Sequence, residues 1–371
     1  MKIGCVKERK HYEYRVGITP ENAKQYILRG HTVYVQTSAG EGAGFSDEMY
    51  TAMGAVVVPT AEAVWSTCEM IVKVKEPLPE EFDLLREGQI LYTYLHLAAD
   101  RTLTEALLRK KVKAVAYETI EDKHGHLPLL KPMSEVAGRL SIQVGARCLE
   151  KQMGGMGLLL GGVPGVKRAN VVILGGGVVG IGACKMAVGL GAQVTILDHN
   201  MERLTYIDDL FEQKVQSLYS TPVTIEQALE EADLVIGAIL IPGAAAAKLI
   251  RREYLRRMKP GSVIVDVAVD QGGCCETTRM TYHDNPTYVV DGVVHYGVAN
   301  MPAAVSKTST IALTNATIGY GTVIADLGLE AAAKQDPGIG KGVNCYAGHM
   351  TCKAVADEFN LPYRDLAELI S

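Results

Sequence analysis

Short apolar runs alternate with amphipathic stretches along the first third of the chain. The apolar, strand-like runs cover residues 2–6, 32–36, 55–58, 70–74, 90–95 and 114–117. Helical stretches lie between them, and Thr19 followed by Pro20 is typical of a helix start, with Gly30 placed to end that helix. Strands that alternate with helices in this way predict a mostly parallel, doubly wound α/β sheet.

A strand–helix–strand pattern with a glycine turn occupies residues 170–198. Gly175, Gly177 and Gly180 have the spacing G-x-G-x-x-G after a short apolar strand, and a second strand ends at Asp198. These glycines permit a tight turn, a close approach of a pyrophosphate to the backbone, and close packing of helix against strand. The pattern predicts a dinucleotide site, and a βαβ unit without a ligand is the alternative.

The acid at the end of the second strand bears on the choice of dinucleotide. A carboxylate at Asp198 can accept hydrogen bonds from a ribose diol and would repel a 2′-phosphate, which favours NAD over NADP. Arg203 keeps NADP open, although its side chain could instead pack along the adenine or pair with Asp198.

The alternation continues beyond Asp198 and defines the rest of the second domain. We expect a helix over residues 134–153 with Ser134 as its N-cap, a helix over 201–211, a helix after the capping-box pattern at 224–227, and strands at 215–219, 234–239, 262–270 and 288–298. Residues 307–371 predict a long helical stretch at about 310–334 and a shorter helix at about 350–359.

These elements predict an α/β protein with two doubly wound domains. Residues 131–306 would form a Rossmann NAD-binding domain, and residues 1–130 plus 307–371 would form a discontinuous substrate domain. Long bridging helices would join the two domains, with a cleft between them.

Composition narrows the class of protein. The 371 residues carry a net charge of −5 and are 48% hydrophobic, which describes a globular protein and gives no argument for binding nucleic acid or a membrane surface. No signal-peptide core and no long apolar span is evident. The eight cysteines form no C-x-x-C pair, so reduced thiols in a cytoplasm are expected, and the histidines show no metal-ligand spacing.

Three basic residues lie where loops leave the predicted strands of the first domain. Arg15 follows the first strand, Lys75 ends the fourth, and His96 ends the fifth. Ligands of doubly wound sheets bind beyond the carboxyl ends of the strands, so these side chains are expected to converge. The alternatives are a surface charge for Arg15, an ion pair with a nearby glutamate for Lys75, and a buried structural histidine for His96.

Asp270 is the strongest catalytic candidate of the second domain. It ends the predicted strand 262–270, at the edge that would hold the nicotinamide. A carboxylate there can orient water, stabilise developing positive charge or move a proton. A helix cap or a solvated loop acid is the alternative, and Asp266 in the same strand could be a buried structural acid.

Six ordered blocks of sequence carry a resemblance to a known family. They are KVKEPLPEE at 73–81, TYLHLAAD at 93–100, LPLLKPMSEVAGR at 127–139, ILGGGVVG at 173–180, KPGSVIVDVAVDQGG at 259–273 and VVHYGVANMPAAV at 293–305. Together they resemble bacterial L-alanine dehydrogenases from about residue 2 to about residue 360. The same family includes the nicotinamide nucleotide transhydrogenase α-subunit.

The resemblance implies an oxidoreductase that uses NAD to deaminate L-alanine reversibly to pyruvate and ammonia. It implies that Arg15 and Lys75 bind the substrate, that His96 acts as acid and base, and that Asp270 is the second catalytic residue. It also implies a homohexamer.

The residues expected to contact the cofactor form a larger set. Those that match the family's nucleotide-contacting positions are Ser134, Val179, Asp198, Arg203, Ser220, Ile239, Leu240, Asp270, Arg279, Asn300 and Met301. The glycine turn and the neighbouring strand ends add Gly175, Gly177, Val178, Gly180, Val267, Ala268, Val269, Val298 and Ala299.

The sequence leaves three other functions open. A transhydrogenase subunit would move hydride between two nucleotides, whereas Arg15, Lys75 and His96 together favour an amino-acid substrate. A non-enzymatic NAD sensor would not need these three polar side chains. A dehydrogenase of another small amino acid would use the same chemistry with a different pocket.

Overall fold

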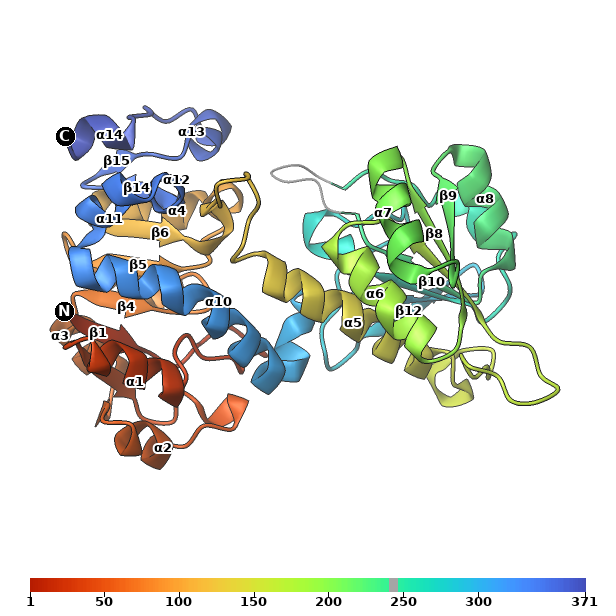
Figure 1. Ribbon diagram of the computed structural model, residues 1–371, viewed down its shortest axis with the longest axis horizontal. Helices are drawn as coiled ribbons and strands as arrows, with labels where there is room; N and C mark the ends of the chain where they lie inside the picture. Colours follow the sequence, from red (N-terminus) through yellow and green to blue (C-terminus); the bar gives the residue numbers. More distant parts are fainter. Residues whose placement is uncertain (240–245) are drawn as a thin grey trace. The chain divides into compact units, whose positions relative to one another are not determined.

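Two mostly parallel sheets organise the chain (Figure 1). The computed structural model describes residues 1–239 and 246–371. One unit comprises Met1–Met133 together with Ala303–Ser371, and the other comprises Ser134–Pro302. Sheets flanked by helices confirm the predicted α/β class.

The sheet of the first unit has the strand order β15-β14-β6-β5-β4-β1-β2-β3. Its strands are β1 (Lys2–Cys5), β2 (Thr32–Gln36), β3 (Val56–Val58), β4 (Met70–Val72), β5 (Ile90–Thr93), β6 (Lys113–Ala116), β14 (Val343–Tyr346) and β15 (His349–Met350). The six strands from β6 to β3 are parallel, and β14 and β15 extend the sheet in antiparallel pairing. The tail of the chain therefore completes the sheet that the first residues begin.

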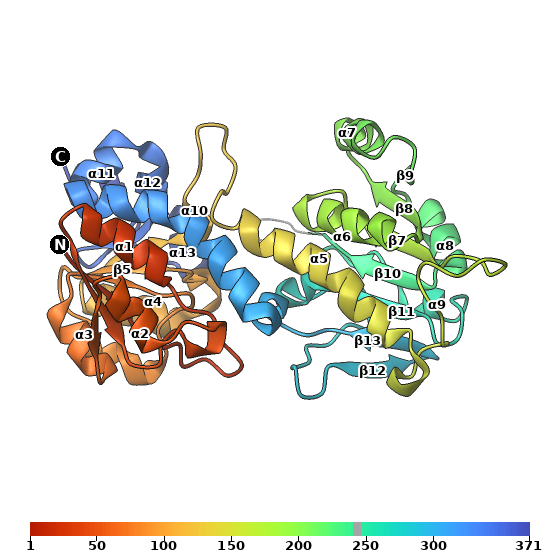
Figure 2. The same cartoon turned by 60° about the horizontal axis from the view of Figure 1, so that its bottom comes forward.

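Helices cover both faces of this sheet. They are α1 (Pro20–Leu28), α2 (Asp47–Ala52), α3 (Ala61–Thr67), α4 (Arg101–Arg109), α10 (Ser306–Leu327), α11 (Leu329–Gln335), α12 (Pro337–Gly342), α13 (Lys353–Phe359) and α14 (Leu366–Leu369). Residues of α3, α4 and α13 form one apolar core with β4 and β5, including Trp65, Leu107 and Val355. On the other face α1 and α10 lie side by side (Figures 1 and 2), and the Tyr92 hydroxyl of β5 donates to the Thr317 carbonyl at 3.0 Å.

The sheet of the second unit has the order β12-β13-β11-β10-β7-β8-β9. Its strands are β7 (Asn170–Leu174), β8 (Gln193–Asp198), β9 (Val215–Tyr219), β10 (Leu234–Gly237), β11 (Val263–Asp266), β12 (Thr287–Val290) and β13 (Val293–Tyr296), with the helices α5 (Lys131–Cys148), α6 (Val178–Gly189), α7 (Met201–Phe211), α8 (Pro222–Glu231) and α9 (Arg252–Leu255). The first residues of α5 belong to the first unit. Every pairing is parallel except β12 with β13.

Several predicted elements of the second unit need correction. The expected strand 288–298 is a hairpin, because Asp291 and Gly292, with φ of +49° and +84°, turn the chain between β12 and β13. Ser134 is not an N-cap but lies inside α5. The capping box of α8 pairs Thr221 with Thr224, so that helix begins at Pro222, earlier than expected.

The helical stretch expected at 310–334 is also divided. Gly328 has a φ of +79° and separates α10 from α11. The Thr19–Pro20 start of α1 is confirmed, since the Thr19 hydroxyl accepts from the Asn22 N–H at 3.2 Å. No helix in residues 1–239 and 246–371 is long and apolar enough to cross a membrane.

All eight cysteines are free thiols, and seven of them are buried. Burial raises the pKa of Cys5 to about 12 and that of Cys184 to about 12. The thiols therefore behave as small apolar side chains of the two cores.

Candidate functional site

One edge of the second unit's sheet gathers the residues predicted to bind the cofactor. The strands from β13 to β9 are parallel, so their carboxyl ends share this edge. The chain reverses its direction of progress across the sheet at β7, which lies between β8 and β10. Such a switch point is where doubly wound sheets bind ligands.

The three glycines after β7 meet different physical demands. Gly175 has a φ of +104°, and a Cβ on Gly180 would lie 1.9 Å from the Gly175 carbonyl oxygen. Gly177 instead faces open space and precedes α6, whose N-cap makes no side-chain hydrogen bond. The N-terminus of α6 can therefore receive a phosphate group directly on its backbone.

Helix α5 packs against the start of α6. A Cβ on Gly138 would lie 2.2 Å from the Val179 carbonyl oxygen, so the two helices touch through their backbones. Ser134 lies four residues before Gly138, on the same face of α5. This arrangement puts Ser134, Val178 and Val179 in the neighbourhood of the glycine turn.

Asp198 is fixed against the glycine turn. Its carboxylate accepts from the Gly176 N–H at 2.6 Å and from the Asn200 N–H at 2.8 Å. The Ser220 N–H donates to the Asp198 carbonyl at 2.9 Å, and the stem of Arg203 packs over Gly176. A ribose carried on the turn would thus meet a carboxylate of fixed position, as the sequence predicts for NAD.

The other predicted cofactor residues come from neighbouring strand ends. Ile239 follows β10 and lies beside Gly175. Arg279 stacks on the Tyr288 ring, 4.3 Å from Cζ to the ring centroid. Residues 298–301, the predicted Val298, Ala299, Asn300 and Met301, follow β13. Leu240 lies outside the described residues.

Asp270 does not end a strand. Strand β11 stops at Asp266, and a one-turn 3₁₀ helix, Val267–Gln271, carries Val267, Ala268, Val269 and Asp270. The cause is Asp266, whose carboxylate accepts from the Ala268 N–H at 3.2 Å and caps this turn. Asp270 is exposed at the sheet edge, and its carboxylate accepts a long hydrogen bond from the Asn300 backbone N–H at 3.4 Å.

Asp266 is a buried structural acid, as the sequence allowed. It is 2% exposed and also accepts from the Cys274 N–H at 2.9 Å, the Cys275 N–H at 3.3 Å and the Thr278 hydroxyl at 2.5 Å. One carboxylate thereby holds both ends of the segment that presents Asp270.

In the first unit, Arg15, Lys75 and His96 come from loops at the carboxyl ends of β1, β4 and β5, which are adjacent strands. Arg15 is not a surface charge, since it is 2% exposed. Its Nε and Nη2 donate to the Glu13 carboxylate at 2.7 and 2.6 Å, and Nη1 lies 3.0 Å from the Met133 sulfur. Burial works to lower the pKa of Arg15, but the hydrogen bonds and charge of Glu13 outweigh it and raise that pKa.

Lys75 has the opposite environment. Its backbone N–H donates to Glu8, but its ammonium has no hydrogen bond or ion pair within the described residues. Of the nearby glutamates that could have paired with it, Glu76, Glu80 and Glu81, two have other partners, since Glu76 pairs with Lys10 and Glu81 with Lys73. Burial, and then the positive charge of Arg15, lower the pKa of Lys75.

His96 is exposed, so the alternative of a buried structural histidine is wrong. It has φ of +52° and ψ of +39°, which is rare for a residue other than glycine. Two successive N–H groups, of Leu95 and His96, donate to the Glu118 carboxylate at 3.1 and 2.5 Å. This carboxylate stabilises a left-handed conformation that would otherwise be strained.

Two residues near these side chains, Tyr94 and Glu118, were not predicted from the sequence, and Glu8 and Glu13 were considered only as neighbours of Arg15 on the surface. The Tyr94 ring lies 5.8 Å from that of His96, and its hydroxyl donates to the Leu129 carbonyl at 2.6 Å. Their positions carried a signal, because Tyr94 lies at the end of the predicted strand 90–95 and Glu118 directly follows the predicted strand 114–117. Among the described residues no cluster of His, Cys, Asp and Glu could hold a metal ion.

Comparison with known proteins identifies the family. Residues 4–137 match the family described as "Alanine dehydrogenase/PNT, N-terminal domain", and residues 141–353 match "Alanine dehydrogenase/PNT, C-terminal domain". The chain belongs to the alanine dehydrogenase/PNT family. The N-terminal match contains Arg15, Lys75 and His96, and the C-terminal match contains the glycine turn and Asp270.

Individual relatives agree with this membership. The alanine dehydrogenase of Methanococcus maripaludis is 55% identical over 364 residues, which is 98% of each chain. A solved L-alanine dehydrogenase superposes with a TM-score of 0.95 at 55% identity and covers 97% of this chain and 99% of its own. A transhydrogenase from Sinorhizobium meliloti, at 23% identity, TM-score 0.84 and coverage of 95% and 100%, shares the alanine dehydrogenase/PNT fold.

Replacement of Asp266 by Asn should destabilise the second unit. An amide oxygen cannot accept from all four donors, and the amide nitrogen would face N–H groups, so we expect a loss of about 2–3 kcal/mol in the free energy of unfolding. Thr278→Val, which removes one donor only, should cost about 1 kcal/mol. Urea denaturation followed by circular dichroism measures both, and equal stability of Asp266→Asn and the parent protein would contradict the assignment.

Proposed function

We propose that the protein is an NAD-dependent alanine dehydrogenase, which converts L-alanine reversibly to pyruvate and ammonia. The observation that carries the proposal is a partly buried lysine without a counterion, Lys75, that faces the charge of Arg15 in a chain 55% identical to an alanine dehydrogenase. Two cations at the carboxyl ends of adjacent strands suit a small carboxylate.

The two cations would divide the work of substrate binding. The Glu13 carboxylate holds the guanidinium of Arg15 by Nε and Nη2, which fixes its plane for binding a second carboxylate. The Lys75 ammonium supplies a point charge that can polarise the pyruvate carbonyl oxygen. A neutral small molecule would gain little from either group, which favours an α-amino or α-keto acid.

Proton transfer would fall to His96. Oxidation requires a neutral amine, the addition of water to the iminium formed on the substrate, and collapse of the carbinolamine, and each step moves a proton. The His96 imidazole can accept and donate a proton, and it is exposed on a conformation that Glu118 stabilises. Asp270, exposed on its 3₁₀ turn, would stabilise the iminium and orient the water.

The cofactor proposed for the second unit is NAD, which accepts hydride from the substrate Cα in oxidation and returns it in reduction. The supporting features are the open space at Gly177, the start of α6 and the fixed carboxylate of Asp198, which disfavours a 2′-phosphate. We further propose a cytoplasmic homohexamer, on the strength of the family resemblance.

The activity should appear as absorbance of reduced nicotinamide when the enzyme is mixed with L-alanine and NAD in alkaline buffer. L-Serine, glycine, D-alanine and NADP are tested in parallel. Turnover with L-alanine and NAD well above the others is expected. Tight binding of NADH with no turnover of any amino acid would favour a transhydrogenase subunit, and a faster rate with a larger amino acid would change the substrate but not the mechanism.

His96→Ala should lower kcat for L-alanine by roughly 10²–10⁴-fold, because a general acid–base group is lost. NADH binding, measured by fluorescence, should persist, since the glycine turn and Asp198 proposed to hold the cofactor are unaltered. His124→Ala is the matched control, as this exposed histidine lies on a turn of the same unit. Near-normal turnover of His96→Ala would overturn the acid–base role.

The lowered pKa of Lys75 predicts a pH dependence of pyruvate binding. Glu76 and Glu13 oppose the effects of burial, Arg15 and Lys10 on this ammonium, but the pKa stays below its ordinary value. The ammonium is charged below that pKa, so pyruvate affinity should fall as the pH rises through it, earlier than for a solvated lysine. Titration of the enzyme–NADH complex with pyruvate, without ammonium salts, measures this. Lys75→Met should bind pyruvate weakly at every pH, and a flat profile of the parent enzyme would contradict the prediction.

A further inference from the structure

Lys73, Glu8 and Glu81 form a buried charge cluster in the first unit. The Lys73 side chain is fully buried, and the glutamates are 8% and 1% exposed. The Lys73 ammonium lies 3.1 Å from a Glu8 oxygen and 3.3 Å from a Glu81 oxygen. Burial of three charges is costly, so a cluster of this kind needs a reason beyond stability.

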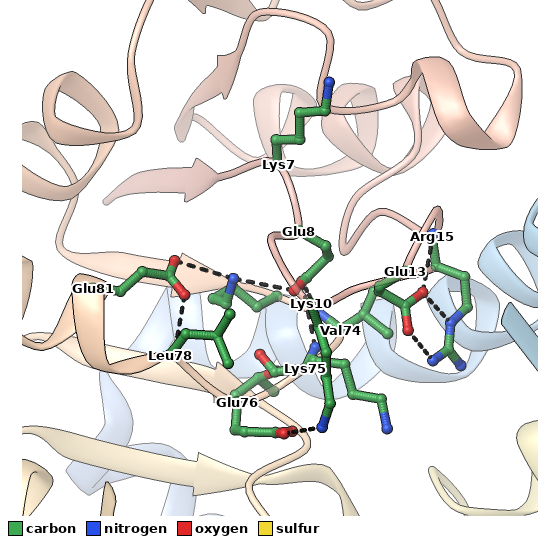
Figure 3. Close-up of polar contacts among 12 residues, drawn as sticks. Lys7, Glu8, Lys10, Glu13, Arg15, Val74, Lys75, Glu76, Leu78 and Glu81 are labelled. Carbon is green, nitrogen blue, oxygen red and sulfur yellow. Dashed lines mark hydrogen bonds and ion pairs between the residues drawn. The ribbon is translucent and has the colours of Figure 1, made fainter. Parts of the chain in front are cut away.

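Glu8 uses its second oxygen on the backbone that carries Lys75. This oxygen accepts from the Val74 N–H at 2.6 Å and from the Lys75 N–H at 3.3 Å (Figure 3). Glu8 follows β1 and Lys75 follows β4, and these strands are paired. The carboxylate therefore joins the loop that leads to Arg15 to the loop that presents Lys75. Lys10 and Glu76 add a second link between the same two loops.

Glu81 also divides its two oxygens between the Lys73 ammonium and the backbone, but the backbone N–H that it accepts from is that of Leu78. One oxygen faces Lys73, and the other accepts from the Leu78 N–H at 3.0 Å. Glu81 thus shares the ammonium with Glu8 but has no contact with Lys75. The two glutamates are a natural matched pair.

The charge of Glu8 is paired with the Lys73 ammonium and not with the Lys75 ammonium. Burial raises the pKa of Glu8, while Lys73 and the Val74 N–H act to keep the carboxylate ionised. Burial also acts to lower the pKa of Lys73, but the two carboxylates outweigh it and raise that pKa. Lys73 therefore neutralises Glu8, and Glu8 touches Lys75 only at its amide. A carboxylate near a catalytic ammonium would otherwise compete with the substrate anion.

We propose that Glu8 is a positioning residue for Lys75. The Glu8 carboxylate holds the Lys75 backbone in place, and the charge of Glu8 is paired with the Lys73 ammonium. The inference rests on the proposed function, because the ligand that Lys75 meets is taken to be the substrate carboxylate and carbonyl. Without Glu8 the Val74 and Lys75 N–H groups lose their common acceptor, and the loop keeps only its weaker ties beside Lys75, the Thr93 hydroxyl that donates to the Lys75 carbonyl at 3.0 Å and the Lys10–Glu76 pair. Misplacement of an ammonium by about 1 Å can cost as much as 10²-fold in rate.

The test compares Glu8→Gln with Glu81→Gln in the full-length enzyme. Each variant leaves one carboxylate opposite one ammonium, so both should fold with similarly lowered melting temperatures. Glu8→Gln should raise the KM for pyruvate and for L-alanine roughly tenfold or more and leave NADH affinity unchanged. Glu81→Gln should keep the parent KM values within about twofold. Equal KM values for pyruvate in the two variants would overturn the positioning role.

A second pair of variants tests the proposal if Glu8→Gln does not fold. Glu8→Asp keeps the charge beside Lys73 but withdraws the carboxylate from the Val74 and Lys75 amides, and Glu81→Asp is its control. A rise in the KM for pyruvate confined to Glu8→Asp supports the proposal, and parent-like kinetics oppose it. If the unmutated enzyme does not oxidise L-alanine, the proposed function and this inference both fail. If the unmutated enzyme is active but the Glu8 and Glu81 variants have the same KM for pyruvate, only the inference fails.

Discussion

Parallel pairing is the constraint on which the rest of the molecule depends. A parallel sheet brings every carboxyl end to one edge, and β1 and β7 each lie between strands that the chain reaches in opposite directions. Residues far apart in the sequence, such as Arg15 and His96, or Gly175 and Asp270, therefore come to the same edge without any long-range contact between their side chains. The helices bury the faces of the two sheets. The antiparallel strands β12, β14 and β15 extend the sheet edges that lie away from the switch points β1 and β7.

Carboxylates that do no chemistry fix the edges of both sheets. In the second unit Asp198 and Asp266 accept backbone N–H groups from the turns around the glycines and Asp270. In the first unit Glu8, Glu13 and Glu118 do the same around Lys75, Arg15 and His96. A carboxylate is suited to this task because it presents two acceptor oxygens and can bind successive amides.

The sequence was sufficient for the parallel strands, since apolar periodicity and glycine spacing are local signals, but it did not predict β14 and β15 in the tail. Strands such as β2 and β9 and the helix α7 have the predicted bounds. It failed where a side chain acts on the backbone at a distance. Asp266 ends β11 early because it caps the following turn. The apolar run 262–270 contains two acids, Asp266 and Asp270, and its pattern does not indicate which of them is the cap. The hairpin at Asp291–Gly292 carried a recognisable local signal that was not used. Which glutamate faces Lys73, Lys75 or Arg15 depends on strand order, which periodicity does not encode.

The distribution of the cysteines has a consequence for labelling chemistry. Maleimides and oxidants react with the exposed thiolate, and burial keeps thiols such as Cys5 and Cys184 both protonated and out of reach. Cys352, just before α13, is the partly exposed exception. A folded chain should accept one fluorophore there, and uptake of further label would report unfolding of a core rather than a second reactive site.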